Sequence, residues 1–265
     1  MRMTASLPLP LRKRLLTALP MTALVLTACS PATPASQEST SPPPPVIDRG
    51  VASISFDDGT IGQYTYARRV LRKHNLPGTY YLVSDALGWG SATINPKQAR
   101  KLLGEGNEIG NHTRDHKDLT KLTTGQMTAE FADAQDAIES QVGVRPTTCA
   151  YPNGSNNAAV LAEAENQFKA CRSTQGGFNK RGRLLTYDLF SYNVHRGTTA
   201  AQVRKAAEQA RISNTWVVFV YHRVDPKLKG ADDVTPKRFA AHVDAIVSTG
   251  IPVQTVESAL AAMSR

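Results

Sequence analysis

The stretch Ser53-Ile54-Ser55-Phe56-Asp57-Asp58-Gly59 decides the fold, because it is a short apolar strand that ends in two carboxylates and a glycine. Neighbouring carboxylates repel each other, so a metal ion or a shared proton is usually what stabilises such a pair. Asp-Asp-Gly is also common in ordinary turns, where the acids accept hydrogen bonds from local backbone amides. The stretch therefore indicates either a metal-binding strand end or a plain turn, and the rest of the chain has to decide between them.

Two segments downstream favour the metal interpretation. Asn111-His112-Thr113-Arg114-Asp115-His116 carries two histidines four residues apart, which fall on one face if the loop enters a helical turn. Val220-Tyr221-His222 ends a strongly apolar segment with a third histidine. One aspartate and two histidines form a ligand set for a divalent ion. The remaining aspartate and histidine are then available for proton transfer.

From residue 51 onward, short apolar segments alternate with helical periodicity, which is typical of repeated β–α units and a mainly parallel sheet or barrel. A length of 265 residues fits one sizeable domain, for which we expect the bounds 51–265. The predicted strands are 52–56, 78–83, 108–110, 147–151, 169–173, 189–194, 216–221 and 251–255. The predicted helices are 64–74, 96–103, 124–142, 157–167, 199–211, 236–249 and 256–263.

Polar residues follow the last apolar residue of four predicted strands. In barrels of this kind the loops after the strands converge at one face, where the chemistry collects. We therefore expect these residues to share one site: Asp57, Asp58, His112, His116, the segment 151–154 and His222.

These segments resemble the motifs of the polysaccharide deacetylase family, also known as carbohydrate esterase family four or the NodB-homology domain, over about 51–261. The resemblance implies that Asp57 is the general base and Asp58 a metal ligand. It implies that His112 and His116 are the other two ligands and that His222 is the general acid.

The same resemblance implies an α/β fold, a distorted (β/α) barrel of seven to eight mainly parallel strands. It also implies one divalent metal ion, for which Zn²⁺ is expected and Co²⁺, Ni²⁺ and Mn²⁺ are alternatives. The predicted function is a metal-dependent hydrolase that removes N- or O-linked acetyl groups from an envelope or extracellular glycan. The alternatives are an amidase or imidase on a non-sugar amide, and a catalytically silent glycan-binding lipoprotein.

The chain departs from the commoner family pattern in two motifs. In Ala150-Tyr151-Pro152-Asn153-Gly154, alanine stands where the common form has arginine, and the resemblance carries the oxyanion-hole amide to Asn153. The fourth motif, normally an aspartate and a tryptophan, is not recognisable around 193–196. Arg196 is the candidate to orient Asp57 in place of the missing arginine, and a surface arginine is the alternative.

Other aromatic and histidine residues give weaker signals. Trp89, in a glycine-rich loop, and Tyr151, at a strand end, are predicted to contact substrate, because aromatic rings stack on sugars. Core packing is the alternative for both. His242 lies in a helical pattern and is predicted to be an exposed polar residue.

The N-terminal 28 residues resemble a bacterial lipoprotein signal peptide, with a basic start, an apolar segment and small residues before Cys29. An ordinary signal peptide is the alternative. Residues 29–50 form a Pro/Ser/Thr-rich tether. We expect an exported protein that a lipid on Cys29 anchors to the cell envelope, on the outer membrane facing the periplasm or at the cell surface. Cys149 and Cys171 are either disulfide-bonded or two buried thiols.

The charge of the chain argues against nucleic acid as a partner. The formal net charge is +9, but four basic residues belong to the leader, which leaves about +5 on the exported chain. The positive residues are scattered and are not interleaved with aromatic residues. The expected partners are an acetylated polysaccharide or oligosaccharide and, through the lipid, a membrane, and we expect a monomer. The lack of a Gly-x-Ser-x-Gly motif argues against a serine esterase.

Overall fold

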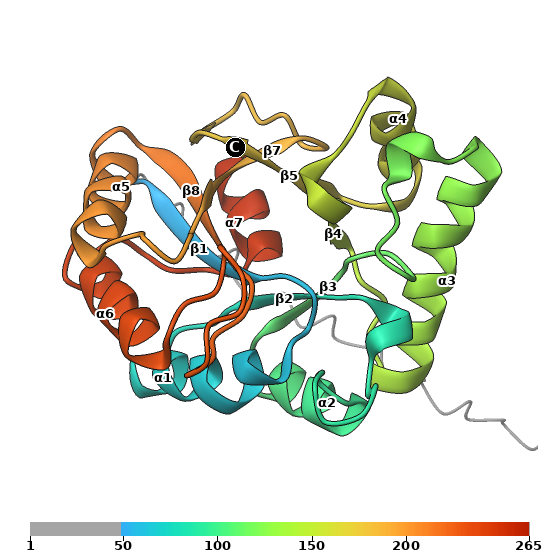
Figure 1. The fold of residues 1–265 in the computed structure, drawn as a ribbon. Coiled ribbons are helices and arrows are strands. Elements are labelled where there is room, and N and C mark those ends of the chain that lie inside the picture. The colour runs from blue at the N-terminus through green and yellow to red at the C-terminus, as the bar shows by residue number, and fades with distance from the viewer. Residues whose placement is uncertain (1–48, 265) are drawn as a thin grey trace, which may run out of the picture. The chain divides into compact units, whose positions relative to one another are not determined.

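The structure, a computed structural model, describes residues 49–264. The predicted signal peptide, Cys29 and nearly all of the predicted tether lie outside these residues. Seven parallel strands close into a barrel in the order β1-β2-β3-β4-β5-β7-β8, because β8 also pairs with β1 (Figure 1). The strands are β1 (Val51–Phe56), β2 (Thr79–Leu82), β3 (Glu108–Asn111), β4 (Thr148–Ala150), β5 (Ala170–Gly176), β7 (Leu189–Asn193) and β8 (Thr215–Tyr221).

Helices surround the barrel and connect its strands. The α-helices are α1 (Arg68–Lys73), α2 (Pro96–Gly104), α3 (Thr124–Val142), α4 (Ala158–Gln167), α5 (Ala200–Ile212), α6 (Pro236–Val247) and α7 (Val256–Met263). Short 3-10 turns are η2 (Ser84–Ala86), η3 (Leu119–Lys121) and η4 (Pro152–Gly154), and a π-helical turn η1 (Gln63–Ala67) precedes α1. Asn95 and Thr235 cap α2 and α6, because each side chain accepts a hydrogen bond from the first turn of a helix that begins with proline.

The predicted single α/β domain with a (β/α) barrel is confirmed, and the first seven predicted strands all form. The eighth prediction, 251–255, is wrong, because this segment makes a single bridge from Val253 to Ala52. A short strand that the sequence did not suggest, β6 (Asn179–Lys180), pairs antiparallel with the start of β8.

The strands bury both faces. Side chains such as Ile54 and Phe56 pack outward against the helices, within the largest apolar cluster of the protein. Val51, Trp216 and Val218 belong to a second cluster that includes α7. The backbone N–H groups of Val256 and Glu257, which begin α7, donate to side chains at the starts of β2 and β3. Helix α7 therefore closes the amino end of the barrel.

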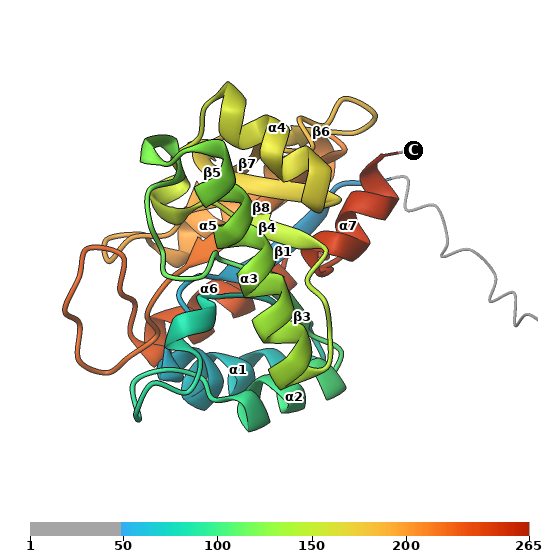
Figure 2. The same cartoon turned by 90° about the vertical axis from the view of Figure 1, so that its right-hand side faces the viewer.

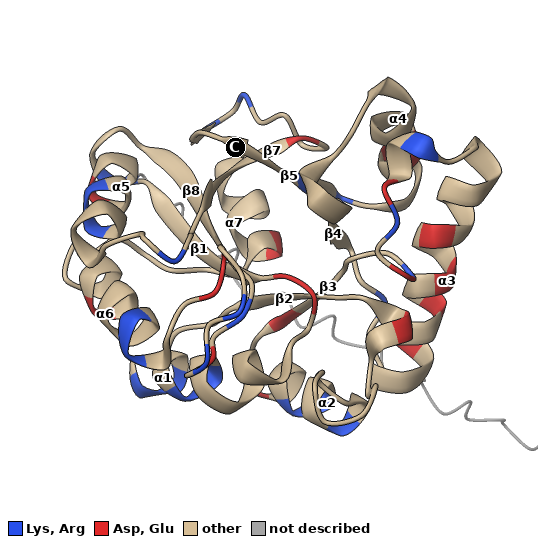
Figure 3. Cartoon of the chain, in the orientation of Figure 1, with Lys and Arg blue, Asp and Glu red and all other residues tan. Residues whose placement is uncertain are grey.

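The carboxyl end of the barrel stays open to the connecting loops, and Figure 2 shows the long β8–α6 connection on the side away from α7. The barrel is distorted on the β3–β7 side. Strands β3 and β4 pair through Asn111 and Cys149 alone, and the pairing of β5 with β7 shifts register between Arg172 and Gly176. Lys and Arg are spread over α1, α2, α5 and α6 and do not gather in one stripe (Figure 3). Within 49–264, every helix is too short or too polar to cross a bilayer.

Candidate active site

A cavity of about 450 Å³ lies at the carboxyl end of the barrel. Nearly all of the predicted site residues line it, although they come from loops far apart in the sequence. The lining residues are Asp57, Asp58, His112, His116, Tyr151, Asn153, Gly154, Thr174, Asn193, Val194, His195, His222 and Asp232. The convergence expected from the strand ends is therefore present.

Asp58, His112 and His116 form a possible metal site. The Nε2 atoms of both histidines lie 3.5 Å from Oδ1 of Asp58, and one ligand atom from each residue lies within 4.8 Å of the others. Ligand atoms at about 2.0–2.2 Å from a tetrahedral Zn²⁺ lie roughly 3.3–3.6 Å from one another, so the two aspartate–histidine distances match such an ion. Burial raises the pKa of Asp58, but the imidazoles of His112, His222 and His116 lower it by more, so that the net pKa is about 2. Asp58 is therefore a carboxylate at any physiological pH, as a ligand must be.

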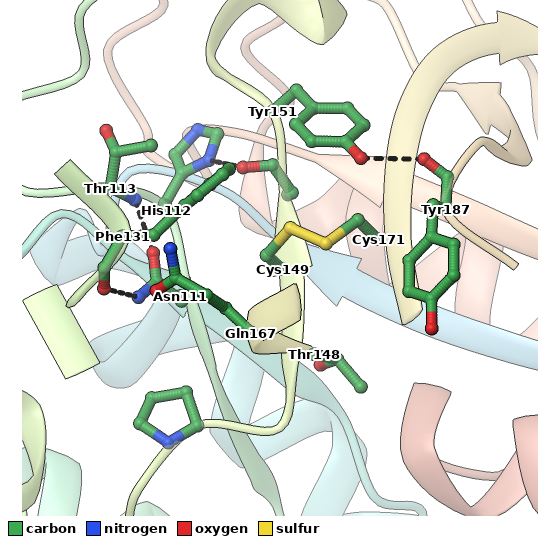
Figure 4. The surroundings of a disulfide bond; sticks show 12 residues. Asn111, His112, Thr113, Phe131, Thr148, Cys149, Tyr151, Gln167, Cys171 and Tyr187 are labelled. Atoms are coloured by element: carbon green, nitrogen blue, oxygen red, sulfur yellow. Dashed lines mark hydrogen bonds between the residues drawn. A yellow bond between two sulfur atoms is a disulfide. The ribbon is translucent and has the colours of Figure 1, made fainter. Parts of the chain in front are cut away.

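His112 is oriented by the backbone. Its Nδ1 lies 2.8 Å from the carbonyl oxygen of Ala150, at the end of β4 (Figure 4). A carbonyl can only accept a hydrogen bond, so Nδ1 carries a proton, and Nε2, which faces Asp58, is the ring atom that would bind an ion. His112 is buried, whereas His116 is about one-third exposed. The site is therefore rigid on its inner side and open on the cavity side.

The segment 111–116 is not helical, so the condition under which both histidines would fall on one face of a helical turn is not met. Thr113 and His116 instead adopt left-handed backbone conformations, and the two imidazole rings meet edge to face at 4.8 Å. Asn111 Oδ1 accepts a hydrogen bond from the backbone of Thr113, and the buried Glu130 of α3 accepts from the two residues that follow. These bonds stabilise a strained loop of the kind that functional sites often contain.

Asp57 pairs with Arg172, which the sequence reasoning missed. Both side chains are buried, and Arg172 Nη2 donates to Asp57 Oδ1. Burial raises the pKa of Asp57, but the Arg172 guanidinium, helped by nearby imidazoles, brings it below its usual range. Arg172 stands on β5 directly beside Ala150 of β4, so the missing third-motif arginine is replaced by one on the neighbouring strand. Its signal was an arginine inside a predicted core strand, where a charge requires a partner.

Arg196 does not orient Asp57, so this prediction is wrong. Its side chain is exposed and donates to the carbonyl oxygen of Gly230, and its backbone N–H donates to Ala231. Arg196 lies beyond the end of β7 and ties two surface loops together.

His222 lies beside Asp57, with 3.9 Å between its Nε2 and Asp57 Oδ2. Gln63 fixes the backbone of both residues, because its side-chain amide donates to the carbonyl oxygens of Asp57 and His222 at 2.5 and 2.9 Å. Nδ1 of His222 is buried and has no hydrogen-bond partner in the part of the chain that the structure describes. Among residues 49–264, no side chain thus takes the place of the aspartate missing from the fourth motif as a partner of this Nδ1.

The third motif forms a tight turn at the cavity wall. Asn153 is in a left-handed conformation, and the N–H groups of Gly154 and Ser155 donate within the turn, to Tyr151 and Pro152. A side chain at Gly154 would meet Thr174 at 2.0 Å, so only glycine lets the turn approach β5 this closely. Tyr151 both lines the cavity and fills the strand end, since it is buried and donates to the carbonyl oxygen of Tyr187 at 2.7 Å.

The exposure of Trp89 and His242 tests what the sequence predicted for them. Trp89 is 76% exposed, which rules out core packing, and it does not line the cavity. His242 is buried, so the prediction of an exposed residue is wrong. Its ring nitrogens contact the hydroxyl of Tyr221 at 3.3 Å and the carbonyl oxygen of Thr198 at 3.0 Å. His242 therefore supports the strand end that carries His222.

Cys149 and Cys171 form a disulfide between directly opposed residues of β4 and β5 (Figure 4). Each cysteine precedes a residue that positions the site: Ala150, which holds His112, and Arg172, which holds Asp57. The alternative of two free thiols is not what the structure shows.

Comparison with known proteins supports the family that the motifs indicate. Residues 47–168 match the sequence model of the polysaccharide deacetylase family. Peptidoglycan-N-acetylglucosamine deacetylase PgdA of Listeria monocytogenes is 33% identical over 113 residues, which are 42% of this chain and 23% of that protein. Peptidoglycan-N-acetylmuramic acid deacetylase PdaC of Bacillus subtilis is 30% identical over 117 residues, which are 43% of this chain and 23% of that protein. The matches thus span about a quarter of these relatives.

A solved structure shares the fold. The Xyl-CE4 domain of a multidomain xylanase from the hindgut metagenome of Trinervitermes trinervoides aligns with a TM-score of 0.58 and 15% identity, over 80% of this chain and 90% of that one. At this identity the likeness concerns the barrel alone.

Proposed function

We propose that the chain is a member of the polysaccharide deacetylase family and a metal-dependent hydrolase that removes acetyl groups, N- or O-linked, from an envelope or extracellular glycan. The observation that carries the proposal is the meeting in one cavity of a metal-ligand set, Asp58, His112 and His116, with a second carboxylate and a third histidine. The family match and the deacetylases among the relatives support it.

The roles of the residues follow from their positions. A divalent ion such as Zn²⁺, when bound by Asp58, His112 and His116, supplies Lewis-acid activation of water and of the acetyl carbonyl. Asp57, kept ionised by Arg172, accepts the proton of the attacking water as general base. The backbone N–H of Asn153 donates to the carbonyl oxygen as negative charge develops there, an interaction worth roughly 3 kcal/mol in comparable sites. His222 donates a proton to the departing sugar nitrogen or oxygen.

A catalytically silent glycan-binding protein is the second candidate. It is favoured by the missing fourth-motif aspartate and by the unpartnered Nδ1 of His222. Its ion site would be the same, but the proton donor would lack a group to orient it.

The deciding experiment measures metal content and acetate release on one purified sample. We expect about one zinc or similar ion per chain, with acetate released from acetylated chitin or xylan oligosaccharides and lost on treatment with a chelator. Full metal content without acetate release from any acetylated glycan would favour the silent binder. Hydrolysis of cyclic or linear non-sugar amides alone would favour an amidase or imidase.

The location in the cell is part of the same proposal. The leader and the segment 26–29 support lipidation of Cys29, and the proline-rich residues that follow suit a tether that holds the barrel away from a membrane. We expect Cys29→Ser to release the protein from the membrane fraction of the expressing cell. Unchanged membrane attachment of this variant would contradict the lipid anchor.

A further inference from the structure

One wall of the cavity carries a histidine–aspartate pair that the proposed chemistry does not use. Nδ1 of His195 lies 2.5 Å from Oδ1 of Asp232, and both residues line the cavity. His195 follows β7 and Asp232 lies in the β8–α6 connection, whereas the possible metal ligands follow β1 and β3. The two side chains are 61% and 44% exposed, so a ligand in the cavity can reach them.

Hydrogen bonds fix this pair in place. Arg196 joins the loops of the two residues by donating to the carbonyl oxygens of Gly230 and Ala231, both at 2.7 Å. The buried Asp233, next to Asp232, accepts from the backbone of Lys229 and Gly230. A bridge between Val224 and Val234 closes the β8–α6 connection at its base. Because the loops are already ordered, a ligand would bind the pair without paying much conformational entropy.

The pair offers polar atoms to a ligand in the cavity. Ionised Asp232 can only accept, so Nδ1 of His195 is the donor between them, and Nε2 on the other side of the ring is left for a ligand. Neighbouring Asn193 already makes hydrogen bonds: its amide nitrogen donates to the carbonyl oxygen of Thr174, and its side-chain oxygen accepts from the hydroxyl of Ser191. Nε2 of His195 and the second oxygen of Asp232 make no hydrogen bond within residues 49–264, so both are available to a ligand.

We propose that His195 and Asp232 bind hydroxyl groups of the sugar residue next to the one that carries the acetyl group, and so determine specificity for a glycan chain. The inference rests on the proposed deacetylase function and deepens it. A sugar hydroxyl can both donate and accept, so it matches Nε2 of His195 as well as the Asp232 carboxylate, and the charge of Asp232 disfavours a neighbouring sugar that bears a carboxylate. Neutral oligosaccharides are the expected class of substrate.

The molecule contains a matched control. His74 Nε2 and Asp244 Oδ1 form a similar pair at 3.0 Å between α1 and α6, and neither residue lines the cavity. Losing that pair removes the same kind of histidine–aspartate contact at a position away from the cavity, so it reports any general effect of the substitution.

The test compares two substrates for each variant: a neutral acetylated oligosaccharide that the wild type deacetylates, and para-nitrophenyl acetate, which reaches only the reacting centre. We expect His195→Ala and Asp232→Ala each to lower kcat/KM about tenfold on the oligosaccharide, mainly through KM. Activity on para-nitrophenyl acetate should change less than about twofold. His195→Gln, which keeps a polar group, should lie between, and His74→Ala should match the wild type on both substrates.

The outcomes separate this inference from the function on which it rests. Equal losses on both substrates, or no loss on either, would overturn the binding role of the pair while leaving deacetylation intact. A wild type that releases acetate from no glycan would overturn the proposed function itself, and the specificity role with it.

Discussion

The two ends of the barrel each bury a carboxyl group, and the two groups differ in their partners and in the direction of their pKa shifts. At the carboxyl end, Asp57 faces the Arg172 guanidinium, which holds its pKa below the usual range. At the amino end, Glu108 accepts hydrogen bonds from Thr79, Thr148 and the backbone of Glu257, and burial raises its pKa. A paired cation keeps a buried acid ionised, whereas neutral donors do so only in part. The difference separates a carboxylate suited to chemistry from one that joins β2, β3, β4 and α7.

Asp57→Asn tests the carboxyl end most strongly. The amide fills the same space but cannot accept a proton, so we expect turnover to fall by about 10²–10⁴-fold, the usual contribution of a general base. The metal content should remain that of the wild type. Asp58→Asn is the control, because it should lose the ion together with the activity. Near-normal turnover of Asp57→Asn would end the assignment of Asp57 as base.

Arg172→Met tests how much the Asp57–Arg172 ion pair stabilises the carboxyl end of the barrel. Removing the guanidinium leaves a buried charge without its partner, so the free energy of unfolding should fall by about 3–5 kcal/mol, with loss of activity. Adding Asp57→Asn to Arg172→Met should recover much of the stability and none of the activity. Urea unfolding and acetate release measure the two effects. A loss under about 1 kcal/mol would mean that other groups hold Asp57.

The Cys149–Cys171 disulfide adjoins the residues that position both halves of the site, and it encloses a short loop because the two cysteines are 22 residues apart. Replacing both cysteines by serine should lower the free energy of unfolding by about 3 kcal/mol through loop-closure entropy. Below the unfolding transition, activity should stay within about threefold of the wild type, since β4 and β5 also pair through their backbones. Complete inactivity of a folded double variant would instead make the disulfide essential for site geometry.

Glu108→Gln probes the amino end and should have the smallest effect. Activity should not change, and stability at neutral pH should stay within about 1 kcal/mol of the wild type. The folded-state pKa of Glu108 is raised above its ordinary 4.5, so the folded protein binds more protons in that range. Wild-type stability therefore contains a term that falls as pH rises from below 4.5 through the folded pKa, and the variant lacks it. If the free energies of unfolding of the wild type and the variant changed in parallel with pH, the raised pKa of Glu108 would be contradicted.

The sequence alone determined the alternation of strands and helices and the strand ends at which Asp57, Asp58, His112 and His116 lie. Both follow from local causes, because apolar periodicity and helix caps act over a few residues. It also indicated the family, since the acid pair and the paired histidines are short contiguous motifs. The sequence also showed where the chain departs from the family pattern, as at Ala150, which stands at the usual position of an arginine.

Only the tertiary structure decided which residue compensates for Ala150. Arg172 lies 22 positions further along the chain, and its role depends on the register between β4 and β5, which no local pattern encodes. The same holds for Cys149 with Cys171, which face each other through the register of β4 and β5, and for His195 with Asp232, which lie on separate loops. The sequence favoured Arg196 because it lies at the position of the fourth motif, but Arg172 is the arginine that is buried beside Asp57. Charges inside a core strand need partners, and the partner is set by neighbours in space.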